Sequence, residues 1–217
     1  MNLATPEPIP YYLMKRIRQG VITGRYPAGS PLREQQLEAE YGTSRGPLRE
    51  ALRLLQLRGL VTHEPRRGFR VREYPAPLVE QIYRLRAVLE RHAVEALVGK
   101  PLDGLIVQLT HFNQCMADHF KARNIEAYLE ANVAFHDAIL QASQNEPLQK
   151  VIEPLNEMAQ PVRFKLLTQR FESSTAINEH AELIALFSEG KMDEAAAFIE
   201  RHVIRNIGSA AHLYPPP

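Results

Sequence analysis

Four residues in the second half of the chain have the types and spacing that could bind a metal ion. Asn132 and His136 lie four residues apart, which on a helix places both side chains on one face. His180 and His202 lie in two later helix-like segments, near their starts or middles. Imidazole nitrogens bind borderline metals such as zinc and nickel. A three-histidine metal site is therefore one reading, and histidines scattered over a helical bundle as ordinary polar residues are the other.

A second chemical pattern is a column of arginines in GTSRGPLREALRLLQLRGLV, residues 42–61. Arg45, Arg49 and Arg53 recur every four residues beside a separate face of leucines. The planar guanidinium of arginine can pair with O6 and N7 of guanine, and other arginines hold phosphates. A solvated amphipathic helix would show the same pattern, so the flanking segments must decide between the two.

The segments before these arginines predict two packed helices. Apolar residues recur at helical spacing over residues 9–23 and again over residues 32–41, with a Gly/Pro turn between them. Thr43 or Ser44 can then cap the arginine-bearing helix, and N–H groups at its start offer a phosphate site. That helix would lay its leucines on the two earlier helices and leave its arginines for a DNA major groove.

The segment after the arginines predicts a basic hairpin. Residues 60–71 have the pattern of two short strands around a turn, with Arg66, Arg67 and Arg70 at its tip. Three helices followed by a basic hairpin are the order of elements in a winged helix-turn-helix. The hairpin would follow the DNA backbone or the adjacent minor groove.

The rest of the chain predicts an all-helical antiparallel bundle. From residue 77 onward six helix-like segments follow one another without a strand pattern. Residues 1–74 carry 13 Lys/Arg against 7 Asp/Glu, whereas the remainder carries 13 against 18, and two prolines mark the junction. We therefore expect a mainly α fold with a DNA-binding domain at 1–74 and a helical domain at 75–217.

Composition narrows the class of protein further. A single cysteine, Cys115, excludes an internal disulfide and suits a reducing compartment. No apolar run approaches the roughly 18 residues that a membrane span requires, and the first residues lack the apolar segment of a signal peptide. The sequence therefore predicts a cytoplasmic protein without membrane contact.

The first domain resembles the N-terminal domain of GntR-family bacterial transcriptional regulators. The resemblance runs without a gap through IRQGVITGRYPAGSPLREQQLEAEYGTSRGPLREALRLLQLRGLV and on to Gly68, which matches the family's wing glycine. It implies that operator DNA is contacted by residues of the second helix, the third helix and the wing. These are Gln35, Ser44, Arg45, Arg49, Arg66, Arg67 and Gly68. Arginine is common in the family where this chain has Gln35.

The second domain resembles the FCD ligand-sensing domain of the FadR subfamily, through RLRAVLE, NVAFHDAILQASQNEPL, EHAELIALFSEG and AAAFIERHV. The resemblance implies a divalent metal (zinc, nickel or manganese) held by Asn132, His136, His180 and His202. It also implies a small carboxylate effector bound by the metal and by Arg86. Many members have Asp where this chain has Asn132, so we expect weaker metal binding here.

The sequence thus predicts a homodimeric transcriptional regulator, most simply a repressor, that binds a palindromic operator and senses a small organic acid. Two alternatives stay open at this point. A metal-dependent hydrolase-like helical domain would also use three histidines with an open coordination position. A constitutive DNA-binding protein would use the bundle for dimerisation only.

Overall fold

The computed structural model describes residues 7–171 and 174–211. Its internal contacts divide the chain into two compact units, Met1–Tyr74 and Pro75–Pro217, called here the winged unit and the helical unit. The boundary lies between Tyr74 and Pro75, at the two-proline junction, and each unit has its own hydrophobic core. None of the described helices has the length and apolar character needed to cross a bilayer.

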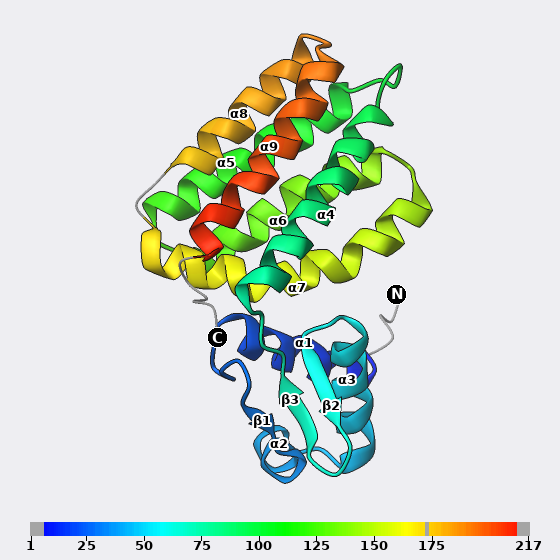
Figure 1. The fold of residues 1–217 in the computed structure, drawn as a ribbon, viewed down its shortest axis with the longest axis vertical. Helices are drawn as coiled ribbons and strands as arrows, with labels where there is room; N and C mark the ends of the chain where they lie inside the picture. The colour runs from blue at the N-terminus through cyan, green and yellow to red at the C-terminus, as the bar shows by residue number, and fades with distance from the viewer. Residues whose placement is uncertain (1–6, 172–173, 212–217) are drawn as a thin grey trace, which may run out of the picture. The chain divides into compact units, whose positions relative to one another are not determined.

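The winged unit combines three helices with a small antiparallel sheet (Figure 1). In chain order its elements are α1 (Ile9–Ile22), β1 (Pro31–Leu32), α2 (Glu34–Tyr41), α3 (Arg45–Leu57), β2 (Val61–Glu64) and β3 (Gly68–Val71). The strand order is β1-β3-β2, with both pairs antiparallel. The hairpin was expected from the sequence, whereas the third strand, β1, is too short at two residues to show a pattern.

The leucine face of α3 holds the winged unit together. Leu48, Leu52 and Leu55 are fully buried and pack with residues of α1 and α2. Burying a leucine side chain contributes roughly 1.5–3 kcal/mol, so this face determines how α3 is seated. Gly42 ends α2 with φ of 60°, a left-handed conformation that glycine adopts without steric cost, and thereby turns the chain into α3. The opposite face of α3 is left to solvent.

The helical unit consists, in its described residues, of six helices with the antiparallel course expected from the sequence (Figure 1). They are α4 (Ala76–Glu95), α5 (Asp103–Lys121), α6 (Ile125–Ala142), α7 (Glu146–Arg170), α8 (Thr175–Ser188) and α9 (Met192–Ala211). Pairs of these helices pack lengthwise, α4 with α9 and α5 with α6, while α7 also contacts α4, α6 and α9. Asn124 and Asn145 cap α6 and α7 by accepting backbone N–H bonds of 3.1 Å.

The core of the helical unit contains ionisable residues as well as apolar ones. Leu109, Phe135 and Ile199 belong to its large apolar cluster and are fully buried. The buried polar residues of the structure are all in this unit: Arg86, Glu90, His136, Ser143, Gln160, His180 and His202. A buried charge is costly unless it is paired and hydrogen-bonded, so the partners of these groups define the candidate site.

Candidate functional site

Three buried histidines from three helices converge inside the helical unit. His136 comes from α6, His180 from α8 and His202 from α9, and one ring nitrogen of each lies within 4.8 Å of those of the other two. The Nε2 atoms of His180 and His202 are 3.3 Å apart. Phe135 stacks on the ring of His180 at a centroid distance of 3.8 Å and limits its rotation. The tertiary fold therefore brings together three histidines that are far apart in the sequence.

Two carboxylates orient two of these rings. Glu90 Oε2 lies 2.6 Å from Nδ1 of His136, and Glu179 Oε2 lies 2.5 Å from Nδ1 of His202. A carboxylate in this position accepts the Nδ1 proton, which leaves Nε2 with its lone pair. Glu179 also forms an ion pair with Arg205. Both pairs thus select the tautomer in which Nε2 can act as a ligand.

The surroundings keep the histidines neutral. Burial lowers the pKa of His136 to about 4, although the Glu90 carboxylate acts in the opposite direction. Burial lowers the pKa of His202 to about 4 as well, and it holds the pKa of His180 well below its ordinary value, helped by the other two histidines. Neutral imidazole is the form that binds metal ions, so no proton must be displaced near neutral pH.

The donor set fits a divalent metal. Two nitrogens that each lie about 2.05 Å from a tetrahedral zinc are about 3.3 Å apart, which is the separation of Nε2 of His180 and His202. Nδ1 of His180 is buried without a hydrogen-bond partner, so no carboxylate holds the proton of this ring on Nδ1, and its Nε2 faces Nε2 of His202. A metal bound here would supply a Lewis-acidic position for an anionic oxygen.

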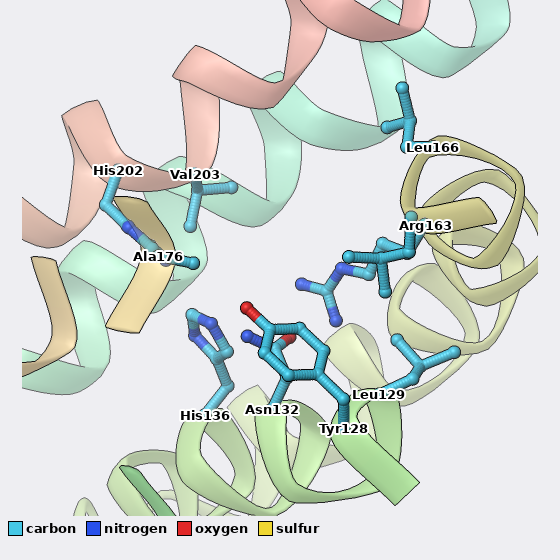
Figure 2. Close-up of a pocket in the computed structure, with 10 residues that line it drawn as sticks. Tyr128, Leu129, Asn132, His136, Arg163, Leu166, Ala176, His202 and Val203 are labelled. Carbon is cyan, nitrogen blue, oxygen red and sulfur yellow. The ribbon is translucent and has the colours of Figure 1, made fainter. Parts of the chain in front are cut away.

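A cavity of about 80 Å³ adjoins the cluster (Figure 2). Its walls combine polar and apolar side chains, namely Tyr128, Leu129, Asn132, His136, Arg163, Leu166, Leu167, Ala176, His202 and Val203. Asn132 lies beside His136 on α6, as their spacing predicts, and the guanidinium of Arg163 from α7 is directed toward them (Figure 2). No hydrogen bond or ion pair joins Arg163 to another described residue.

Arg86, the expected effector-binding arginine, does not line this cavity. Its side chain is 0% exposed, with Nε donating to Asn156 Oδ1 and Nη2 donating to Glu90 Oε1, both at 2.6 Å. Burial lowers the pKa of Arg86 to about 10, with a further contribution from the charge of Arg163. Burial also acts to raise the pKa of Glu90, but His136 and Arg86 outweigh it and hold that pKa below its ordinary value. Arg86 therefore keeps Glu90 ionised behind His136.

Sequence reasoning passed over three residues of this site. Glu90 lies four residues after Arg86, a spacing that allows an ion pair along one helix face and that could have indicated it. Glu179 directly precedes His180 but contacts His202, which no local pattern predicts. Arg163 reaches the cavity only because α7 packs against α6, so its position also depends on tertiary structure.

In the winged unit, the arginines of α3 form an exposed basic face. Arg45 Nε donates to Glu34 Oε2 at 2.6 Å, and Arg49 Nε lies 3.7 Å from Glu34 Oε1. The side chains of Arg45 and Arg49 are 68% and 41% exposed. Glu34, in the first turn of α2, therefore holds both arginines side by side while they still face solvent. The sequence did not point to this role for Glu34.

The other predicted DNA contacts are also at the surface. Gln35 and Ser44 are exposed, and Ser44 occupies the N-cap position of α3 without a side-chain capping bond. Arg66 and Arg67 are exposed in the turn between β2 and β3, which ends at Gly68. Arg70 is not at this tip as expected, since it lies within β3 and donates to the carbonyl of Gly29 at 2.5 Å. The side chain of Arg70 therefore bonds within the winged unit and does not lie at the wing tip.

Both units match known protein families. Residues 13–71 match the family model of bacterial regulatory proteins of the gntR family, and residues 81–205 match that of the FCD domain. The two matches coincide with the two compact units of the structure.

Relatives of known sequence and structure agree with these matches. An uncharacterized HTH-type transcriptional regulator, YdhC of Bacillus subtilis, is 29% identical, over 95% of this chain and 94% of its own. The gluconate operon transcriptional repressor of the same organism is 27% identical, over 77% of this chain and 70% of its own. The solved structure of McbR/YncC from E. coli superposes with a TM-score of 0.81 at 21% identity, covering 96% of this chain and 99% of its own.

Proposed function

Because the chain belongs to the gntR family of bacterial transcriptional regulators and carries an FCD domain, we propose that it is a repressor whose DNA binding responds to a small carboxylate. Its family and relatives are regulators and not enzymes, which removes the hydrolase alternative. The observation that carries the proposal is a cluster of three neutral, buried histidines beside a cavity with an unpaired arginine. A domain that served only for dimerisation would have no need of such a site.

The winged unit would bind a palindromic operator through α3. Arg45 and Arg49, aligned by Glu34, would read base edges or hold phosphates in the major groove. Gln35 and Ser44 would contact the backbone beside them, and the turn with Arg66 and Arg67 would follow the next groove. Helix-terminal N–H groups near Ser44 would add a phosphate contact.

The helical unit would bind the effector and the metal together. His136, His180 and His202 would hold a divalent ion such as zinc, nickel or manganese, with Asn132 as an uncharged oxygen donor. The effector carboxylate would bind between this ion and Arg163, while Arg86 acts from behind by keeping Glu90 against His136. This assignment moves direct effector binding from Arg86 to Arg163.

Regulation would act through a homodimer. One winged unit offers few base contacts, so useful specificity requires two copies that meet half-sites about one helical turn apart. The helical units would form the two-fold interface, and effector binding would favour one spacing of the two recognition helices over another. Light scattering should give twice the mass of one chain, and a monomer would contradict this part of the proposal.

The direct test measures binding of the full-length protein to DNA from the region upstream of its own gene. Band shifts are compared with and without acetate, propionate, lactate and pyruvate, in the presence of zinc. We expect a specific shifted complex that at least one carboxylate weakens in the wild type but not in His180→Ala. A complex that ignores every acid would favour the constitutive DNA-binding alternative, and the absence of any specific complex would contradict the repressor.

A further inference from the structure

The walls of the cavity carry an unusual balance of charge for a cation site. Among the residues that line it, Arg163 is the one formally charged side chain, and no carboxylate is present. Asn132 contributes a neutral amide next to His136. A divalent ion at the histidine cluster would therefore lie beside a fixed positive charge, with no negative group on the cavity wall to offset it.

The two carboxylates that contact the histidine rings are each paired with an arginine. Glu90 is shared between His136 and Arg86, with 2.6 Å contacts to both. Glu179 is shared between His202 and Arg205. Each carboxylate is thus matched by an arginine of its own, so neither pair adds net negative charge around the cluster.

Arg163 lies close enough for its charge to act on the cluster. It lines the same cavity as His136 and His202, and its guanidinium is directed toward His136 (Figure 2). A fixed positive charge beside these rings disfavours a divalent cation bound to them, because like charges repel. Inside a protein such repulsion is stronger than in water.

We propose that Asn132 and Arg163 make metal binding at this cluster conditional on the effector, so that a divalent ion and a small monocarboxylate bind cooperatively. The inference rests on the function proposed above. The carboxylate supplies the negative charge that the cavity wall lacks, with one oxygen toward the ion and the other toward Arg163. The ion alone would add its charge to that of Arg163 with no negative group on the cavity wall, whereas the carboxylate offsets both positive charges.

The same features limit the chemistry of the effector. A single arginine matches a single carboxylate, and the cavity of about 80 Å³ has room for a small acid. Leu129, Leu166 and Leu167 provide an apolar wall for a short hydrocarbon tail. The site therefore selects a short monocarboxylate, and a second acid group would remain unpaired at that wall.

The test is calorimetric titration of zinc into the metal-free, full-length protein. The buffer anion is acetate, propionate, lactate or chloride at equal ionic strength. Coupling between two sites is typically about 5–150-fold, and we expect zinc to bind about tenfold or more tightly in at least one carboxylate than in chloride. Cobalt(II) is titrated in parallel, because its visible absorption reports an oxygen ligand that enters when the carboxylate is added.

Two variants separate the contributions to this coupling. Asn132→Asp places a carboxylate on the wall, so zinc should bind more tightly in chloride and gain little from the added acid. Arg163→Gln removes the repulsion and the anion contact together, with the same two results. Arg91→Gln removes an arginine from an exposed ion pair on α4 and should behave as the wild type. The free acid also binds zinc weakly in solution, and this competition is the same in the titrations of all variants.

The outcomes distinguish this inference from the function on which it rests. If the wild type binds one zinc through His180 with equal affinity in all four anions, the cooperativity is contradicted while the metal site stands. If His180→Ala binds the same amount of zinc as the wild type, the metal site itself is in the wrong place. In that case the inference falls with it.

Discussion

Arg86 and Arg45 are the same kind of side chain in opposite surroundings. Arg86 is fully buried in the helical unit and bonded to Glu90 and Asn156, whereas Arg45 is 68% exposed in the winged unit and bonded to Glu34. The buried arginine is held in one position by these two partners, and its positive charge helps to keep Glu90 ionised. The exposed arginine is only aligned, with its guanidinium left for a partner. Burial, rather than residue type, separates the arginine that positions Glu90 from the arginine that we propose for DNA recognition.

The largest expected difference between the two regions concerns stability. Glu90→Ala would leave the charge of Arg86 buried without its carboxylate, which typically costs about 3–5 kcal/mol of the free energy of unfolding. Glu34→Ala removes the carboxylate partner of two exposed arginines and should cost about 1 kcal/mol or less. Urea unfolding followed by circular dichroism, with hydrogen exchange to assign each transition to a unit, measures both. Equal costs would show that burial does not separate these arginines.

The second difference concerns acid. His136 and His202 have a pKa of about 4 in the folded protein, against an ordinary value of about 6.5, so only the unfolded chain takes up their protons between these values. The helical unit should therefore lose stability as the pH falls from about 6.5 to 4, by on the order of 3 kcal/mol for one such group.

Hydrogen exchange as a function of pH can locate this loss. Protection, corrected for the intrinsic exchange rate, should fall in α6 and α9 before it falls in α1 and α3. The winged unit buries no histidine in its described part. His202→Gln should reduce the pH dependence, and a parallel loss of protection in both units would contradict the assignment.

The third difference concerns DNA. Arg49→Ala should weaken operator binding by about 1–3 kcal/mol if its guanidinium reads a base edge, without destabilising the fold. Arg91→Ala changes an exposed arginine of the helical unit and serves as the matched control. Fluorescence anisotropy with labelled operator measures both variants. Unchanged affinity in the Arg45→Ala, Arg49→Ala double variant would rule out α3 as the recognition helix.

The smallest expected effect is at the wing. Arg67 is exposed in the turn of the hairpin, so Arg67→Ala should weaken binding by a similar factor on specific and unrelated DNA. The slope of log affinity against log salt should fall by about 1, because one phosphate contact is lost. The same measurement on Arg66→Ala tests whether both arginines act in this way. A loss confined to the operator would instead make the wing a base-reading element.

The sequence alone determined the features that repeat along a single helix or turn. The leucine spacing of α3 predicted a buried face, and Leu48, Leu52 and Leu55 are all fully buried. The spacing of Asn132 and His136 placed both residues at one cavity. The family resemblance supplied His180 and His202, which spacing did not join to the other two. These features are local because helical geometry relates residues three or four positions apart, whatever the rest of the chain does.

Only the tertiary structure decided how these local features meet. It placed Arg163 of α7 rather than Arg86 of α4 at the cavity, and it set Glu179 against His202 instead of its neighbour His180. It also moved Arg70 from the wing tip into the sheet, where it bonds to Gly29. Each of these contacts joins two elements of the chain, and their relative rotation follows from how their apolar faces pack. Sequence spacing along one helix carries no information about that rotation, although the rotation decides which charged side chain lines the cavity beside the histidines.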